Sequence, residues 1–166
     1  MSTQATRIEL LQRMPVFGAI RDDALQFLIE HTRTVRVPAG AYFFRENDQA
    51  VSMFVLEAGR AAVIKTWRGR ELVLHRLAAG DCFGEMALMD LFPRSASVRA
   101  EQDCSAIELA AADLLRLFEH DAEQFALIQM NIGREISRRL RTTDELLFRA
   151  CMGETDTQPA GLFRSS

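Results

Sequence analysis

The sequence between Phe83 and Ala100 reads F-G-E-M-A-L-M-D-L-F-P-R-S-A-S-V-R-A. Gly84 is followed by helix-forming residues in a run too short for a regular helix, and such a single turn exposes backbone N–H groups that favour an anion. Arg94 can return a guanidinium to that anion, because its planar fork matches phosphate oxygens. Glu85 adds a carboxylate that accepts hydrogen bonds from sugar hydroxyls. The stretch therefore predicts a site for a phosphate joined to a sugar.

The segments around this stretch have the pattern of an antiparallel β-structure. Short runs rich in Val, Ile, Phe and Leu alternate with turn residues over positions 34–109. The runs are Thr34–Val37, Ala41–Arg45, Met53–Glu57, Ala61–Trp67, Glu71–Leu77, Ser95–Ala100 and Cys104–Leu109. Arg68-Gly69, between two alternating runs, indicates a tight hairpin. Many strands at near-regular spacing predict a sandwich or a barrel.

Helical periodicity flanks the β-region on both sides. We predict helices within residues 6–30, the first over Thr6–Met14 and stopped by Pro15, the second opening at Asp22. Residues 110–150 return to a helical period, with a short helix followed by a long one from about residue 121. We therefore expect one α+β, mainly β, domain over 1–150. The small and polar segment 151–166 is interpreted as a flexible tail.

Composition narrows the class of protein. The formal net charge of −3 argues against a protein whose main role is to coat nucleic acid. Three cysteines without CxxC spacing favour a reducing cytoplasm over a disulfide framework, and we predict no metal site. The N-terminus lacks the apolar region of a signal peptide, and no apolar run approaches the roughly 18 residues of a membrane span. We expect a cytoplasmic protein with no membrane partner.

Two motifs resemble the signature of cyclic-nucleotide-binding domains. That signature is F-G-E-[apolar]-[Ala/Gly]-L followed by R-[Ser/Thr/Ala]-A and a strand, and Phe83–Leu88 and Arg94–Val98 match its halves. The resemblance extends over roughly Met14–Leu147. It implies a β jelly roll (double-stranded β-helix) with N-terminal helices and a long C-terminal helix. One departure is Asn47, where the family usually has Gly; because Asn tolerates a left-handed backbone, we expect the turn to be kept.

The resemblance also implies roles for individual residues. Glu85 should bind the ribose 2′-hydroxyl, and Arg94 should pair with the cyclic phosphate. The N–H groups of Gly84 and its successors, the Ser95 hydroxyl and the small Ala96 should complete the phosphate cradle. The expected ligand-binding residues are Phe83, Gly84, Glu85, Met86, Ala87, Arg94, Ser95, Ala96, Thr143 and Asp144. The simpler alternative is that Glu85 and Arg94 form an ordinary ion pair in a loop.

The base should lie against the C-terminal helix, where Thr143 and Asp144 align with a Thr-Ser pair of bacterial catabolite activator proteins. Thr143 can donate to and accept from an adenine edge, whereas an ionised Asp144 suits the guanine N1–H and amine. We favour cAMP over cGMP as the ligand and expect no cofactor. The alternative for both side chains is a solvated helix face.

We predict a stand-alone cyclic-nucleotide sensor whose C-terminal helix relays binding to a partner or a second subunit. A homodimer could form through the 121–150 helix, using Ile128, Ile132, Leu140, Thr143 and Leu147. Cys151–Ser166 is too short for a helix-turn-helix, so we expect no DNA-binding domain, and the downstream partner stays unidentified. The alternative is a ligand-free interaction module on the same fold. An enzyme is not expected, since neither a metal cluster nor a placed general base is visible.

Overall fold

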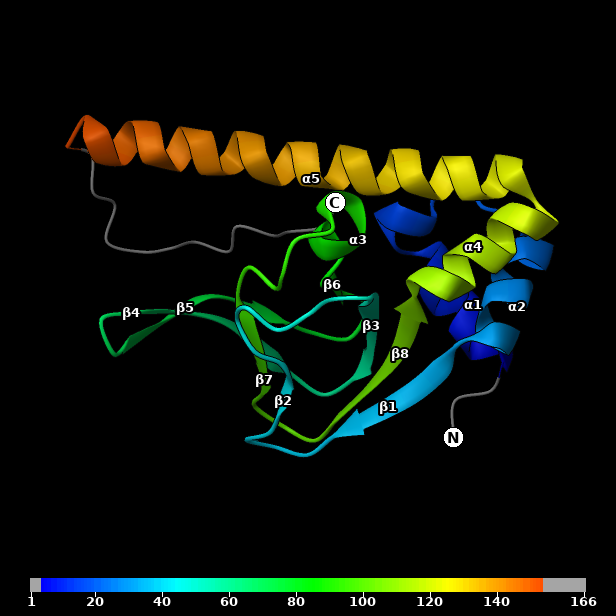
Figure 1. Ribbon diagram of the computed structural model, residues 1–166, viewed down its shortest axis with the longest axis horizontal. Helices are drawn as coiled ribbons and strands as arrows, with labels where there is room; N and C mark the ends of the chain where they lie inside the picture. Colours follow the sequence, from blue (N-terminus) through cyan, green and yellow to red (C-terminus); the bar gives the residue numbers. More distant parts are fainter. Residues whose placement is uncertain (1–3, 154–166) are drawn as a thin grey trace.

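Helices lie at one end and along one side of a β-structure (Figure 1). The computed structural model describes residues 4–153. Its helical elements are α1 (Gln4–Gln12), the 3₁₀ turn η1 (Pro15–Phe17), α2 (Asp22–His31), α3 (Met86–Asp90), α4 (Ala111–His120) and α5 (Ala122–Cys151). Pro15 begins the 3₁₀ turn, and α1 ends before it, as its missing N–H and fixed φ require. The predicted tail lies outside the described residues apart from 151–153, and Cys151 still belongs to α5.

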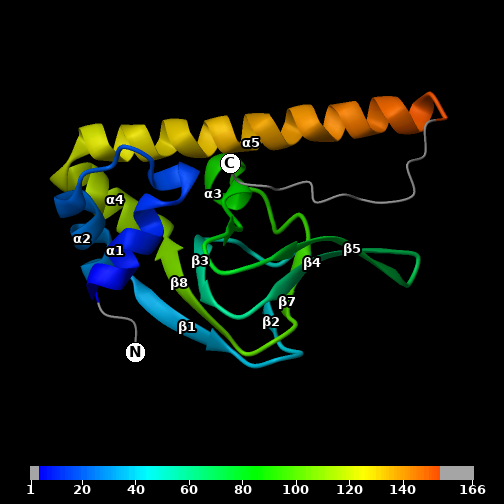
Figure 2. The same ribbon diagram turned by 180° about the vertical axis from the view of Figure 1, so that it is seen from behind.

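Eight antiparallel strands of the described chain form two four-stranded sheets (Figure 2). The strands are β1 (Arg33–Val37), β2 (Tyr42–Phe44), β3 (Ser52–Ala58), β4 (Ala61–Trp67), β5 (Arg70–Leu77), β6 (Cys82–Phe83), β7 (Ser97–Ala100) and β8 (Cys104–Ala110). One sheet has the order β1-β8-β3-β6 and the other β2-β7-β4-β5. This is the strand order of a jelly roll, so the predicted antiparallel sandwich is confirmed.

Strand boundaries differ from the prediction at two places next to the site. The two-residue strand β6 was not predicted, because Cys82-Phe83 is too short to show alternation; it pairs with β3 through Phe54 and Val55. Ser95 and Ala96 precede β7 instead of opening it. The predicted hairpin is confirmed, since Arg68 and Gly69 adopt φ of 48° and 76° between β4 and β5.

Two hydrophobic clusters stabilise the fold. The larger one joins the helices to β3 and β8, and the fully buried Ile128 and Ile132 of α5 belong to it. The smaller one fills the space between the sheets with aromatic rings, where Phe54 and Phe83 stack with centroids 5.3 Å apart. Burial of Ile128 and Ile132 makes one expectation wrong: these two side chains pack inside the domain and cannot pair two subunits.

Helix α5 has two different halves (Figure 1). Its first half packs on η1 and α4 and contributes the buried isoleucines. From residue 141 onward every described position of the helix is exposed. The second half therefore runs past the body of the domain on the same side as the β4–β5 hairpin (Figure 1).

Candidate functional site

Arg94 occupies the centre of the site, between the two sheets and α3. Its side chain is almost fully buried, with the guanidinium carbon 4.0 Å from the centroid of the Phe44 ring. Nη1 donates to the Gly84 carbonyl at 3.0 Å, and Nη2 donates to Ser52 Oγ at 3.4 Å. Nε is buried and has no hydrogen-bond partner. Arg94 is therefore a buried cation with one N–H donor, Nε, that has no acceptor.

The backbone of Arg94 is fixed by the turn that follows β2. The N–H of Asn47 donates to the Arg94 carbonyl at 2.8 Å, and the N–H of Arg94 donates to the Asp48 carbonyl at 2.9 Å. Asn47 holds the left-handed backbone, with φ of 71°, that this turn needs. The expectation that Asn47 keeps the turn in place of Gly is confirmed.

No carboxylate forms a salt bridge with Arg94 within residues 4–153. Burial lowers the pKa of the Arg94 guanidinium, because removing a cation from water disfavours its charge. Glu85, whose carboxylate is equally buried, pairs with Arg139 of α5 instead. The alternative of an ordinary Glu85–Arg94 ion pair is therefore wrong. Glu85 contacts α5 through Arg139, whereas Arg94 contacts β3 through Ser52.

Gly84 has no room for a side chain. Its φ is 79°, and a Cβ atom there would lie 2.5 Å from Arg94 Nη1. The five-residue helix α3 starts two residues later, which agrees with the predicted single helical turn. Glycine at this position thus allows the guanidinium and the start of α3 to approach each other.

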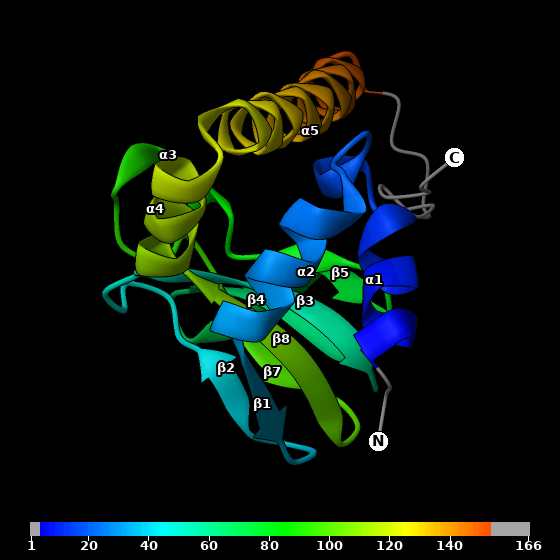
Figure 3. The same cartoon turned by 90° about the vertical axis from the view of Figure 1, so that its right-hand side faces the viewer.

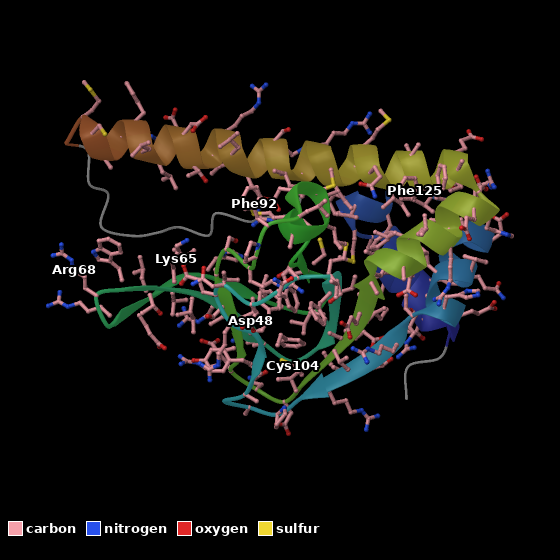
Figure 4. All side chains as sticks on the ribbon, viewed as in Figure 1. Asp48, Lys65, Arg68, Phe92, Cys104 and Phe125 are labelled. Atoms are coloured by element: carbon pink, nitrogen blue, oxygen red, sulfur yellow. The ribbon has the colours of Figure 1, made fainter. Side chains whose placement is uncertain are left out.

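These residues line a cavity of about 70 Å³. Eight of the ten predicted ligand-binding residues line it: Phe83, Gly84, Glu85, Met86, Ala87, Arg94, Ser95 and Ala96. Lys65, on the hairpin whose tip carries Arg68, donates from Nζ to the Ser95 carbonyl at 2.9 Å and so ties the hairpin to the cavity rim (Figure 4). A cavity this small accommodates an anionic group but not a whole nucleotide, since small-molecule sites typically measure ~300–1,000 Å³.

Thr143 and Asp144 are exposed on α5 and do not line the cavity. Thr143 Oγ1 donates to the Arg139 carbonyl one turn earlier on the helix, at 2.9 Å. Their proposed contacts with a base stay a prediction.

Sequence reasoning missed three polar residues of the site. Ser52 contacts Arg94, Arg139 pairs with Glu85, and His75 lines the cavity from β5. Arg139 lies four residues before Thr143 and so on the same face of the helix, which was an available signal. No local pattern marks Ser52 or His75, because their role depends on how the sheets pack.

Comparisons with known proteins identify the family of this chain. The family model described as "Cyclic nucleotide-binding domain" matches residues 34–121. A cAMP-dependent protein kinase regulatory subunit from Emericella nidulans is 31% identical over 107 residues, which is 64% of this chain and 26% of the relative. A cyclic AMP receptor protein from Thermus thermophilus is 28% identical over 131 residues, which is 78% of this chain and 59% of the relative. The chain thus spans between a quarter and three fifths of the length of these relatives.

Solved structures share the architecture. The catabolite activator protein of Thermus thermophilus aligns with a TM-score of 0.74 at 27% identity, covering 82% of this chain and 63% of that one. A cyclic nucleotide-binding domain from Methylobacillus flagellatus aligns with a TM-score of 0.77 at 20% identity, covering 88% and 83%. The jelly roll implied by the sequence resemblance is confirmed.

No helix between residues 4 and 153 combines the length and the apolarity of a membrane span. The same residues contain no group of three or more His, Cys, Asp or Glu side chains arranged to hold a metal ion.

Proposed function

The chain belongs to the cyclic nucleotide-binding domain family, and we propose that it is a sensor domain that binds cAMP and relays binding through α5. In this proposal Arg94 pairs with the cyclic phosphate and Glu85 accepts from the ribose 2′-hydroxyl. The role is regulatory rather than catalytic, because the relatives named above are regulatory proteins. Three free cysteines favour a reducing, cytoplasmic location for it.

The buried Arg94 is the observation that carries the proposal. A buried guanidinium with no carboxylate partner costs free energy unless an anion compensates it. Its unpartnered Nε and the absence of a side chain at Gly84 leave the cation open to a ligand at the cavity. A phosphate matches both the charge and the donor geometry of Arg94. If Arg94 served only in a structural ion pair, neither the unpartnered Nε nor the glycine at position 84 would be required.

The contact between Glu85 and Arg139 suggests how binding reaches α5. Glu85 lies between β6 and α3, whereas Arg139 lies near the middle of α5, and their ion pair joins the pocket to the helix. A ribose hydroxyl that bonds Glu85 must share this carboxylate with Arg139. Entry of a nucleotide into a cavity of about 70 Å³ also requires α5 or α3 to move outward. Binding therefore shifts the position of α5 if one position binds the nucleotide more tightly.

Base recognition in this proposal falls to the exposed face of α5. Thr143 and Asp144 lie one turn beyond Arg139 on α5. A motion of α5 that displaces Arg139 therefore displaces these two residues as well. We favour cAMP because Thr143 can donate to and accept from adenine, with cGMP as the alternative through Asp144. The competing function, a ligand-free interaction module, predicts that neither nucleotide binds.

Isothermal titration with cAMP and cGMP tests the proposal. We expect both to bind, cAMP more tightly. Arg94→Ala should weaken binding by about 2–4 kcal/mol, because the phosphate loses a buried charged partner. Arg99→Ala is the matched control: Arg99 lies on the neighbouring β7, pairs with Glu71 and does not line the cavity. Absence of heat and of a thermal shift at millimolar nucleotide would leave only the interaction module, whereas a loss below ~0.5 kcal/mol in Arg94→Ala would mean that the anion binds elsewhere.

A further inference from the structure

A second and larger cavity lies on the other side of Arg139. We call it the α1–α5 groove; its volume is about 720 Å³, within the ~300–1,000 Å³ of small-molecule sites. Its walls are the end of α1 with the η1 turn (12–18), the end of β5 with the following turn (75–82), and one face of α5 (Figure 3). It shares His75, Cys82 and Arg139 with the nucleotide pocket.

Arginines outnumber carboxylates among the residues that line this groove, although the chain as a whole carries a net negative charge. Four arginines line it, namely Arg13, Arg76, Arg138 and Arg139, against two carboxylates, Asp81 and Glu135. They come from three separate elements and converge on one space. The formal net charge of the chain is −3, so this local excess of cations is a property of the groove.

The carboxylates of the groove are already engaged. Asp81 Oδ2 accepts a hydrogen bond from the Ala78 N–H at 2.7 Å, and Glu135 pairs with Arg138 at 3.0 Å. Asp81 thereby helps close the turn before β6 instead of presenting its charge to a cation. Glu101 pairs with Arg76 and Glu85 pairs with Arg139 from outside the groove lining, so Arg13 is the groove arginine that has no ion pair with a described residue.

The arginines, by contrast, can accept a new partner. Arg13 is exposed and has no hydrogen bond or ion pair with any described residue. The side chains of Arg76 and Arg138 are 63% and 65% exposed, and surface pairs such as theirs contribute only about 0–1 kcal/mol. An anion that enters the groove can therefore bind these two arginines, with or without their present carboxylate partners, at a small cost in free energy.

The face of α5 toward the groove has regular spacing. Glu135, Arg138, Arg139 and Thr142 line it at intervals of three and four residues, which places them on one side of the helix. Thr142 adds a hydroxyl, and His75 stays neutral near pH 7 because burial lowers its pKa to about 4. Donors on α5 thus face Arg13 and Arg76 across the groove.

We propose that the α1–α5 groove binds a small polyanion, a molecule with two or more phosphate or carboxylate groups. Arg13 after α1, Arg76 on β5 and Arg138 on α5 bind it from three parts of the groove lining, and several guanidinium groups in one groove select for more than one anionic group. This site adjoins the nucleotide pocket and shares His75, Cys82 and Arg139 with it, but it does not include Arg94 and does not depend on the proposed sensor function.

Titration of the full chain with tripolyphosphate and with citrate tests the proposal and distinguishes phosphate from carboxylate ligands. We expect at least one of them to bind in 150 mM salt. The double variant Arg13→Gln, Arg138→Gln should weaken that binding at least tenfold. Arg149→Gln is the matched control, because Arg149 is an exposed, ion-paired arginine of the same helix that does not line the groove. Circular dichroism melts should confirm that each variant is folded.

Three outcomes would overturn the proposal. The first is that neither anion binds at millimolar concentration. The second is that Arg149→Gln weakens binding as much as the double variant, which would indicate nonspecific attraction. The third is that Arg94→Ala abolishes polyanion binding, which would place the anion in the nucleotide pocket. Failure of cAMP to bind leaves the groove proposal intact, since Arg94 does not line the groove.

Discussion

Gly84 brings the backbone next to the Arg94 guanidinium, and one added methyl group tests this contact. We expect Gly84→Ala to weaken cAMP binding at least tenfold, because its Cβ would lie 2.5 Å from Nη1 and displace the phosphate partner. Gly69→Ala provides a matched control: its φ of 76° is equally left-handed, but nothing lies within 4 Å of the added Cβ. Both variants should lose about 1 kcal/mol of stability from backbone strain.

Calorimetric titration of the two alanine variants with cAMP measures the difference. The close approach matters only if the loss of affinity is confined to Gly84→Ala. Equal affinities for cAMP in both variants and in the natural sequence would show that the Arg94 side chain moves away from the added Cβ without loss of binding. The close approach of Arg94 would then not explain why position 84 is glycine.

Single residues also show what sequence could predict. The backbone needs of Asn47 follow from residue type and are as expected, whereas the expected contact of Arg94 with a phosphate stays a prediction. The partner of Glu85 does not follow, because Arg139 lies 54 positions away and meets it only through the path of α5. Helical periodicity predicts which residues share a face with Arg139, but not which part of the β-structure that face meets.

At the scale of elements, β5 carries His75 beneath α5, where the histidine should make stability depend on pH. Burial, with a smaller contribution from the Arg139 cation, lowers the pKa of His75 to about 4 from the ordinary 6.5. Between these values the unfolded chain binds a proton that the folded chain does not, so the free energy of unfolding falls as the pH drops below 6.5. Solvent screening at this partly exposed site limits the loss by pH 5 to about 1–2 kcal/mol.

Urea denaturation at pH 7 and pH 5 measures this loss. His75→Gln should remove most of the pH dependence in this interval. The carboxyls of Glu108 and Asp121 have lowered pKa values in the folded state, so they titrate at more acidic pH and interfere little. Parallel stability curves for His75→Gln and the natural sequence would contradict the assignment.

Helix α5 itself illustrates where elements were predicted well and where they were not. Its apolar period predicts one long helix, and the helix spans Ala122–Cys151. The same period does not reveal that Ile128 and Ile132 pack in the core while Leu140 and Leu147 stay exposed. The stripe is continuous in sequence, but the body of the domain ends beneath it partway along the helix (Figure 1).

At the scale of the whole molecule, the exposed half of α5 and the β4–β5 hairpin project from the same end of the domain (Figure 1). Both carry large apolar side chains, with Leu140 and Leu147 59% and 62% exposed on the helix and Trp67 74% exposed on the hairpin. Leu140 and Leu147 are seven residues apart and share one helix face. Such a face is stabilised when a second copy covers it.

We therefore predict a homodimer through the outer half of α5, and the variant Leu140→Ser, Leu147→Ser tests it by mass measurement across a concentration series. Each leucine withdrawn from water contributes about 1.5–3 kcal/mol, and four would be lost per dimer, so the dissociation constant should rise far more than tenfold. The domain should remain folded because both side chains are exposed in the single chain. Leu72→Ser is the control, since Leu72 is 65% exposed but lies on β5. A chain that is monomeric at every concentration would contradict the dimer. Dissociation by Leu72→Ser to the same extent would also contradict it, because the effect of the α5 variant would then not be specific to that helix.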